Sequence, residues 1–246
     1  MKSQKSYRFV VAMAVMAVWC ATPGFAASIT GTVAFEGTPP TMKTLDMNAD
    51  PICAAKHTEP AKAETLVLGP GNTMGNVFVQ IKSGVPKKDY PAPEGEVTLT
   101  QEGCMYKPHV FGVRVGQPIK ILNPDGTLHN IHALPKVNTE FNMAMPKFKT
   151  EMTKVFEKEE AVFPFKCDVH PWMNAYCAVL SHPFFAVTGP DGKFKIEGLD
   201  AGEYEIEAWH ERLGPQTVKV TVAADETKTQ DFKFAAPAAA AAAPAK

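Results

Sequence analysis

The 246-residue chain lacks an excess of charge of either sign, and beyond its first residues it lacks any long apolar run. Its 25 Lys and Arg residues are balanced by 26 Asp and Glu, and the formal charge of -1 argues against a nucleic-acid partner. A helix needs about 20 apolar residues to cross a bilayer, so we expect no membrane span. Cysteine is also scarce, with five residues in all, so each of them needs an explanation.

Residues 1–27 have the pattern of a cleaved signal peptide. Three basic residues precede the apolar stretch 9–21, and small residues suited to a signal peptidase follow it. The apolar stretch is too short for a spanning helix. Cys20 follows the bulky Trp19, where a lipoprotein signal needs a small residue, so we expect Cys20 to be discarded with the leader. The protein is therefore expected to be periplasmic or secreted.

From residue 28 onward the apolar residues recur in short runs of period two, separated by Gly and Pro. Examples are residues 29–35, 65–68, 76–81 and 97–100. Alternation of this kind is typical of half-buried β-strands. Many closely spaced strands, with 21 prolines concentrated in the connections, predict an all-β chain built as an antiparallel sandwich with little helix.

We expect two domains. Residues 28–183 are predicted to form the first, including a long N-terminal extension, and residues 184–234 a small C-terminal β-sandwich with a hairpin turn at 189–192. Residues 235–246 are an Ala/Pro tail that cannot bury a core and is predicted to be disordered. Because the C-terminal unit is short, the strand at 29–35 is a candidate to cross over and complete it, which would interleave the two domains.

The run CDVHPWM at residues 167–173 is the strongest chemical signal in the chain. It places the thiol of Cys167, the imidazole of His170 and the thioether of Met173 within seven residues. Soft sulfur ligands suit Cu(I), and imidazole suits both Cu(I) and Cu(II). The run therefore predicts three ligands of one copper ion, with a second imidazole expected from the turn-rich loop 124–132.

Zinc is the rival metal, since tetrahedral Cys and His sites are common. Met173 argues against zinc, because a thioether is a poor zinc ligand and a good copper ligand. A two-centre copper site would need a second cysteine four residues from Cys167, but these positions are Phe163 and Pro171. The remaining alternative, a disulfide half beside a surface imidazole and a core thioether, leaves Cys167 without a partner.

The other exported cysteines are assigned by elimination. Cys53 lies in the segment 48–57, where a polar cap followed by Pro51 predicts a short helix, and Cys104 lies in a turn. Cys177 lies on a strand, where it either packs as a small hydrophobe or joins the chemistry of Cys167. We therefore favour a disulfide between Cys53 and Cys104, although sequence alone does not fix the connectivity.

The Cys-x2-His-Pro-aromatic-Met run, with His-Asn-x-His about forty residues upstream, resembles the ligand loops of the cupredoxins, the amicyanin-, plastocyanin- and pseudoazurin-like type 1 blue copper proteins. The resemblance covers roughly residues 74–181 and implies a Greek-key β-sandwich. It carries over His129 as the fourth ligand and Asn130 as the residue that ties the two ligand loops together. Pro171 and Trp172 would then help to keep the copper sulfur dry.

This resemblance implies one type 1 copper ion and an electron carrier that works with a redox protein, a cytochrome or a dehydrogenase. It also implies that the ring edge of His170 reaches the surface within an apolar patch, where electrons enter and the partner docks. The chain has no His-x-His pair of the kind that copper oxidases use, so we expect no enzyme. The alternative is a copper-binding, copper-delivery or structural envelope module without electron transfer.

Two further histidines are not carried over as ligands. His132 follows His129 by three residues and is better explained as a strand-edge side chain bonded to a backbone carbonyl. His109 follows a proline and is better explained as a solvated loop residue, although a second soft copper site formed with Met105, Met143 and Met145 stays open.

The segment Gly-Leu-Asp-Ala-Gly-Glu-Tyr at residues 198–204 resembles the signature of carboxypeptidase-regulatory-like, transthyretin-type domains. This second resemblance covers about residues 184–234 and rests on a few positions. Domains of this kind are usually spacers or binding supports, and that role is what the resemblance implies here.

Overall fold

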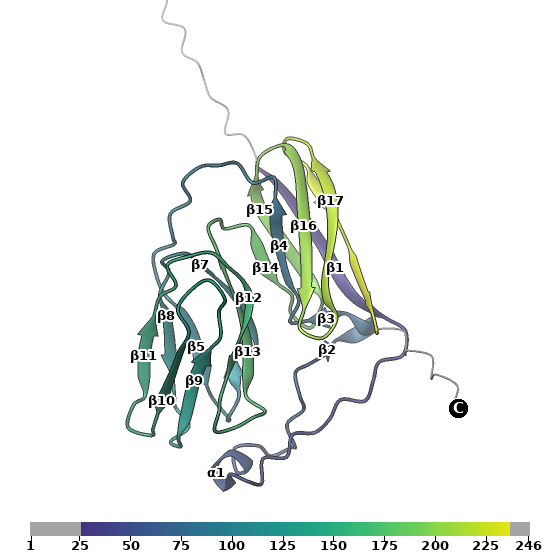
Figure 1. Cartoon of the computed structure of the whole chain (residues 1–246). Coiled ribbons are helices and arrows are strands. Elements are labelled where there is room, and N and C mark those ends of the chain that lie inside the picture. The colour runs from purple at the N-terminus through teal and green to yellow at the C-terminus, as the bar shows by residue number, and fades with distance from the viewer. Residues whose placement is uncertain (1–25, 237–246) are drawn as a thin grey trace, which may run out of the picture.

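The computed structural model describes residues 26–236, and over this part the chain is nearly all β, as predicted (Figure 1). The helical elements of the described residues are two short turns, α1 (Pro51–Ala54) and η1 (Pro70–Asn72). The predicted signal peptide before residue 26 and the predicted tail after residue 236 lie outside the described residues. Between residues 26 and 236 no helix has the length and apolar character needed to cross a membrane.

Residues 97–180 form the first sandwich. One of its sheets has the strand order β10-β9-β12-β13-β7, and the other has the order β11-β8-β5-β6. The strands are β5 (Val97–Gln101), β6 (Tyr106–Lys107), β7 (Val110–Arg114), β8 (Ile119–Leu122), β9 (His129–Ala133), β10 (Phe141–Met145), β11 (Glu151–Lys154), β12 (Glu160–Lys166) and β13 (Asn174–Leu180). Alternate residues point inward, so Leu99, Ile121, Ile131 and Phe165 are fully buried between the sheets.

The second sandwich also has two sheets, with the strand order β14-β4-β16-β17 in one and β1 paired to β15, β18 and β19 in the other. Its strands are β1 (Ala27–Glu36), β4 (Phe78–Ser83), β14 (Phe185–Val187), β15 (Lys193–Leu199), β16 (Gly202–His210), β17 (Gly214–Val222), β18 (Thr227–Thr229) and β19 (Phe232–Ala235), and the small hairpin of β2 (Val67–Leu68) and β3 (Met74–Gly75) lies beside it. Ile29, Ile81 and Ile206 are fully buried in the shared core.

The predicted domain boundary at residues 183 and 184 does not separate the two sandwiches. Strand β1 pairs with β15, and β4 pairs with β16, although both precede the boundary by about a hundred residues or more. The strands after residue 184 cannot cover both faces of a core by themselves, so β1 and β4 complete it. The first sandwich is therefore an insertion between β4 and β14, and the two units interleave.

Two finer expectations also need correction. The sandwiches are not purely antiparallel, because β7 pairs with β13, β5 with β8, and β1 with both β18 and β19 in parallel. Connections that cross between the sheets bring strands of the same direction together, which a local pattern does not reveal. Ala27, assigned to the removed leader, begins β1 and is 1% exposed, so the fold starts one residue earlier than predicted.

An extended segment links β1 to the hairpin of β2 and β3 and is called the arm here (residues 37–66). It leaves the second sandwich, runs to the far end of the first sandwich and returns, with α1 at its tip (Figure 1). Asp50 caps α1 by accepting hydrogen bonds from the N–H groups of Ile52 and Cys53. Cys53 is joined to Cys104 of the first sandwich by a disulfide. This is the pair that the sequence favoured.

The two sandwiches meet along β7 and β13 on one side and β4 and β14 on the other. Phe78, Val110, Ala178 and Leu180 form a separate buried cluster at this junction. Beside it, the carboxylate of Glu211 accepts hydrogen bonds from His109 Nε2 at 2.6 Å and from the Tyr176 hydroxyl at 3.1 Å. The junction therefore combines an apolar cluster with a group of hydrogen bonds to the buried carboxylate of Glu211.

Candidate metal centre

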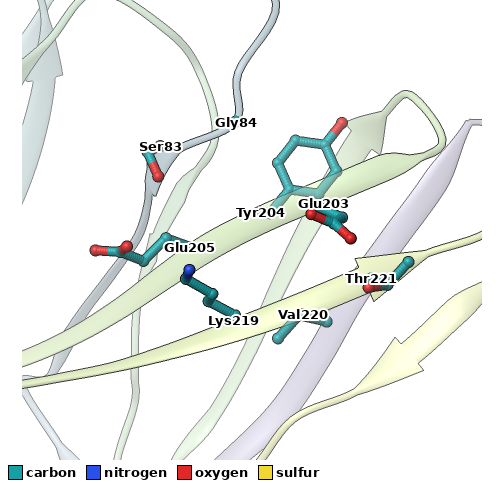
Figure 2. Close-up of a pocket in the computed structure, with 8 residues that line it drawn as sticks. All are labelled: Ser83, Gly84, Glu203, Tyr204, Glu205, Lys219, Val220 and Thr221. Atoms are coloured by element: carbon teal, nitrogen blue, oxygen red, sulfur yellow. The ribbon is translucent and has the colours of Figure 1, made fainter.

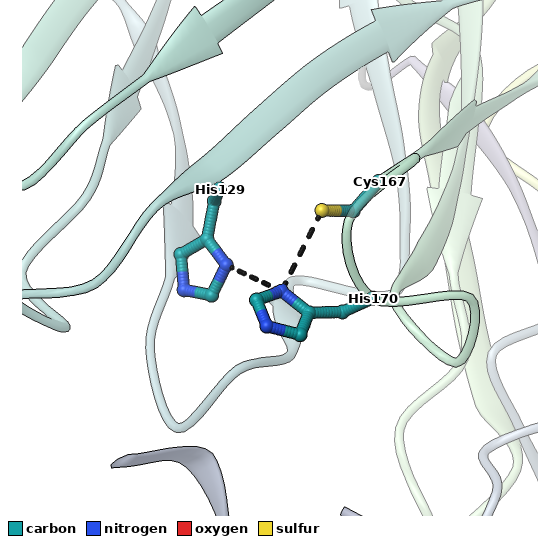
Figure 3. A group of neighbouring side chains, drawn as sticks. All are labelled: His129, Cys167 and His170. Atoms are coloured by element: carbon teal, nitrogen blue, oxygen red, sulfur yellow. Dashed lines mark hydrogen bonds between the residues drawn. The ribbon is translucent and has the colours of Figure 1, made fainter. Parts of the chain in front are cut away.

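Two loops at one end of the first sandwich bring the predicted ligands together (Figure 3). One loop, residues 123–128, connects β8 to β9, so His129 stands at the start of β9. The other runs from Cys167 to Met173 between β12 and β13, and it is closed by a hydrogen bond of 3.1 Å from the Cys167 N–H to the Met173 carbonyl. Because β9 and β12 are neighbours in one sheet, the two loops emerge side by side.

Three of the four predicted ligands converge on one point. His129 Nδ1 lies 3.0 Å from His170 Nδ1, and Cys167 Sγ lies 3.7 Å from the same nitrogen (Figure 3). One donor atom of each residue lies within 4.8 Å of the others. The three side chains are nearly inaccessible to solvent, with exposed fractions of 0%, 2% and 2% for His129, Cys167 and His170.

These separations fit a shared metal ion. Nitrogen and sulfur donors bound about 2.0–2.3 Å from one ion at trigonal or tetrahedral angles lie roughly 3–4 Å from each other. The observed 3.0 Å and 3.7 Å fall in this range. Two bare imidazole nitrogens this close would otherwise have to share a single proton. The donor set of two imidazoles and one thiolate is also the trigonal set of a blue copper site.

Met173 lies at the end of the second loop. Its side chain is 1% exposed and belongs to the same buried cluster as Cys167. Its N–H donates to the carbonyl of His170 at 2.9 Å, so its backbone position is tied to that of the histidine. Its assignment as a copper ligand stays a prediction.

Each histidine is also held from behind by a carboxylate, a feature that the sequence analysis missed. His129 Nε2 lies 3.0 Å from Asp125 Oδ2. Asp125 in turn accepts hydrogen bonds from the N–H groups of Gly103 (2.9 Å) and Cys104 (2.6 Å) and pairs with Lys56 at 3.1 Å. Gly103 and Cys104 both have positive φ, at 67° and 51°, which turns their successive N–H groups toward the same anion.

His170 has the equivalent partner on the arm. Its Nε2 lies 3.0 Å from Asp50 Oδ2, so the two imidazoles point their Nδ1 atoms at each other and their Nε2 atoms at carboxylates. A carboxylate behind a ligating histidine fixes the tautomer and makes the free nitrogen a stronger donor. The signals available in the sequence were weak: Asp125 lies four residues before His129 in a Pro-Asp-Gly turn, and Asp50 has the position of a helix cap.

The electrostatics favour a thiolate beside charged or metal-bound imidazole. Burial opposes ionisation of Cys167, but hydrogen bonds from His129 and from backbone N–H groups outweigh it and lower the pKa of this thiol. Burial likewise opposes protonation of His129, but its hydrogen bonds to Asp125 and Cys167 raise its pKa. Burial also opposes ionisation of Asp125, yet hydrogen bonds from His129 and the backbone hold the pKa of this carboxyl well below its ordinary value. A cation shared by these groups would balance the two negative charges.

No protein-family model and no curated protein matches this chain. Solved structures that resemble it include cupredoxins. A mutant of amicyanin with Cu(I) matches at 19% identity and a TM-score of 0.31, covering 41% of this chain and 97% of that one. A purple cupredoxin from Nitrosopumilus maritimus matches at 22% identity and a TM-score of 0.28, covering 34% and 98%. Likeness at this level is weak, so the case for a metal centre rests on its own geometry.

Asn130, the residue expected to tie the loops together, joins them directly. Its side-chain oxygen accepts a hydrogen bond of 2.5 Å from the N–H of Asp168 on the second loop. Its amide group donates to Asn142 at 2.6 Å and to the Asp168 carboxylate at 3.3 Å. Since Asn130 follows one ligand and Asp168 follows another, these bonds set the spacing between His129 and Cys167.

The two residues after His170 have different surroundings. The Trp172 ring centroid lies 5.1 Å from that of His170, and its indole N–H donates to the carbonyl of Cys104 at 3.0 Å. Trp172 therefore packs the imidazole against the turn that carries the disulfide. Pro171 is exposed at the surface of the loop.

The expected exposure of the His170 ring is wrong. His170 is 2% exposed, because the tip of the arm lies over its outer edge, with Cys53 Sγ 3.6 Å and Asp50 Oδ2 3.0 Å from Nε2. Three apolar residues next in the sequence to Cys53, His129 and His170 are exposed: Ile52, Leu128 and Val169 each have more than 40% of their surface open to solvent. Exposed apolar side chains are therefore present on these segments, but the ring edge of His170 itself is covered.

The remaining candidates lie apart from this cluster. His132 bonds to the carboxylates of Asp168 at 3.0 Å and Glu140 at 2.8 Å, and not to the backbone carbonyl that was expected. The expected solvated position of His109 is also wrong, because His109 is 5% exposed and lies at the junction between the sandwiches, where it contacts Glu211. Cys177 is fully buried, and this burial raises the pKa of its thiol, so it is packed as a small hydrophobe.

A separate hollow of about 270 Å³ lies on the second sandwich beside β16 and β17 (Figure 2). It is lined in part by Glu205 and Lys219, which face each other across the two strands. These are ordinary cross-strand partners of opposite charge. The hollow contains neither a histidine nor a cysteine, and it has no part in the metal centre.

Proposed function

We propose that this chain is an exported copper protein that carries single electrons between redox proteins. In this proposal one type 1 copper ion would be held by His129, Cys167, His170 and Met173. The observation that supports it is the convergence of two imidazole nitrogens and one sulfur in a buried site on two adjoining loops. Bound copper would supply reversible one-electron chemistry between Cu(I) and Cu(II).

The protein's own contribution would be to hold the ligands still. Asn130 sets the distance between the loops, and Asp50 and Asp125 hold the two imidazoles from behind. Ligands that are locked by their neighbours change position little between oxidation states, which keeps the cost of electron transfer low. The buried surroundings of Cys167 exclude water from the sulfur.

Two features support the proposed export of the protein. The leader pattern of residues 1–27 and a disulfide between Cys53 and Cys104 both suit an oxidising compartment outside the cytoplasm. The partner would be a cytochrome or a dehydrogenase that docks on the exposed apolar side chains of Ile52, Leu128 and Val169. We propose no enzymatic role and no nucleic-acid partner.

The second sandwich would serve as a support for the copper-binding sandwich, in keeping with its resemblance to carboxypeptidase-regulatory-like domains. Within the resembling segment, Tyr204 is buried and its hydroxyl donates to the carbonyl of Asp200 at 2.7 Å. This bond holds the turn between β15 and β16 in place. Its role is therefore structural in this proposal.

A visible spectrum tests the proposal. Protein produced from the full chain is loaded with Cu(II), and an intense thiolate-to-copper band that bleaches on reduction is expected. Cys167→Ala should abolish the band. Cys177→Ser is the matched control and should keep it, since Cys177 lies outside the cluster. A colourless parent, or a band that survives Cys167→Ala, would rule the proposal out.

A second candidate is a protein that holds or delivers copper without transferring electrons. The observation that favours it is the covered edge of His170, through which electrons would otherwise pass. The two candidates differ in the rate of electron exchange between the copper-loaded protein and a small soluble cytochrome. Rapid exchange supports the carrier, and a coloured protein that exchanges slowly supports the copper-holding role.

A further inference from the structure

The arm contacts His170 through the carboxylate of Asp50, and the two oxygens of this carboxylate have different partners. Oδ1 of Asp50 accepts the N–H groups of Ile52 (2.9 Å) and Cys53 (3.3 Å), which caps α1. Oδ2 faces His170 Nε2 at 3.0 Å and the Thr127 hydroxyl at 3.4 Å. The cap fixes the orientation of the carboxylate, so Oδ2 is presented to the imidazole without freedom to turn away.

This contact determines which nitrogen of His170 is free. An imidazole that donates its Nε2–H to a carboxylate has a bare Nδ1, and Nδ1 is the atom that faces His129 and Cys167. Without Asp50 the ring could take the other tautomer or rotate. Asp50 therefore holds His170 in the form that a metal requires, although it contacts no other predicted ligand.

Several contacts fasten the arm over the site. The disulfide joins Cys53 to Cys104 across a Cα–Cα distance of 5.5 Å. Lys56 pairs at 3.1 Å with Asp125, the carboxylate behind His129, and a hydrogen bond of 2.7 Å joins His57 Nε2 to the Gly103 carbonyl. The arm thus supplies the carboxylate behind His170, and through Lys56 it also contacts the carboxylate behind His129.

We propose that the arm is a built-in cover of the metal centre, latched by the Cys53–Cys104 disulfide, and that Asp50 is its positioning residue for His170. The cover excludes solvent and outside ligands from the imidazole edge that would otherwise be open. This inference rests on the proposed copper function for its second half only, because a cover can be measured on the protein without metal.

The first experiment uses metal-free protein. N-ethylmaleimide reacts with accessible thiols, and peptide mapping by mass spectrometry gives the labelling rate at Cys167 alone. The double variant Cys53→Ser/Cys104→Ser should label several-fold faster than the parent, because the latch is gone and no new thiol is introduced. Circular dichroism confirms that the variant is folded. Labelling of Cys167 at the parental rate in the folded variant would overturn the cover.

The second experiment uses copper-loaded protein and tests whether Asp50 positions His170. Asp50→Asn should lower the affinity for Cu(II) by about 10–100-fold, the usual effect of removing a carboxylate behind a ligating histidine, and should shift the thiolate-to-copper band. Asp50→Glu should restore much of both, since its carboxylate can still accept the Nε2–H. Asp46→Asn is the matched control, an exposed aspartate on the same arm whose carboxylate caps only the N–H of Asn48.

The outcomes separate the two proposals. If Asp50→Asn matches Asp46→Asn in affinity and spectrum, the positioning role is wrong while the copper function stands. If the parent binds no copper, the proposed function fails, and the labelling of Cys167 still decides whether the arm is a cover. A faster copper loss to a chelator in the double cysteine variant, with the parental spectrum before the loss, supports the latch.

Discussion

Glu211 is expected to hold the two sandwiches together, and its removal gives a direct test of the junction. Its carboxylate is 5% exposed and accepts hydrogen bonds from His109 Nε2 at 2.6 Å and from Tyr176 at 3.1 Å. Glu211 follows β16 of the second sandwich, whereas both donors belong to the first. Burial, followed by the charge of Glu211, raises the pKa of Tyr176 to about 12.

The size of the effect follows from these bonds. A hydrogen bond to a charged group contributes about 1.5–3 kcal/mol, and a buried donor left without a partner costs a further 1–3 kcal/mol. The cost of burying the carboxylate itself offsets part of this sum. Glu211→Ala should therefore lower the free energy of unfolding by about 3–4 kcal/mol. Glu211→Gln, which keeps the shape and one acceptor, should lower it by about 1–2 kcal/mol.

Urea unfolding followed by tryptophan fluorescence measures this loss. Trp209 reports on the junction, because its ring lies 5.2 Å from that of Tyr176. Glu197→Ala is the matched control, a glutamate on β15 that is 67% exposed and pairs with Lys195 at the surface, and it should cost less than about 0.5 kcal/mol. If Glu211→Ala lowers the free energy of unfolding no more than Glu197→Ala does, the hydrogen bonds to Glu211 do not stabilise the junction and the reasoning fails.

Three further predictions concern the metal centre, a buried histidine and a loop anchor. Met173→Leu should keep a coloured copper site but shift its reduction potential, as measured by voltammetry, and a variant that matches the parent would remove Met173 from the ligand set. Burial lowers the pKa of His210 from 6.5 to about 4, so its neutral form stabilises the fold above pH 6.5 and this contribution is lost as the pH falls toward 4. At about 1.4 kcal/mol for each pH unit, the stability advantage of the parent over His210→Gln should shrink by about 2–3 kcal/mol between pH 7 and pH 4, and a constant difference in urea unfolding would contradict this. Glu160 is buried and accepts the three consecutive N–H groups of residues 136–138, so Glu160→Ala should cost about 2–4 kcal/mol in thermal or urea unfolding, and a loss below about 0.5 kcal/mol would show that these groups find other partners.

The sequence was informative wherever the physical cause is local. Alternation of apolar residues sets the period of a strand, and it therefore marked residues 29–35, 76–81 and 97–100 near the strands β1, β4 and β5. Ligands that lie on one short loop stay close together in any fold, so the run 167–173 was enough to predict the position of the candidate metal centre. The disulfide between Cys53 and Cys104 could be favoured because four exported cysteines leave few pairings.

What the sequence did not reveal depends on contacts between distant residues. Asp50 is separated from His170 by 120 positions, and its local role as a helix cap accounts for it fully when the chain is read alone. Alternation shows which face of a strand is buried but not which strand lies beside it, so the pairing of β4 with β16 was not visible. The expectation that the ring edge of His170 is exposed was wrong because it also depends on a distant contact. The segment that covers this edge, residues 37–66, lies before the first sandwich in the sequence.

The insertion of one sandwich into the other has a consequence for the order in which an exported chain can fold. Strand β1 lies far ahead in the chain of its partners β15, β18 and β19. If the protein is exported as proposed, β1 and β4 emerge outside the cytoplasm before β14 to β19 and stay unpaired, while residues 97–180 can already close around their own core. Cys53 and Cys104 both precede β14, so the disulfide can join the arm to the first sandwich in the oxidising compartment before the second sandwich is complete.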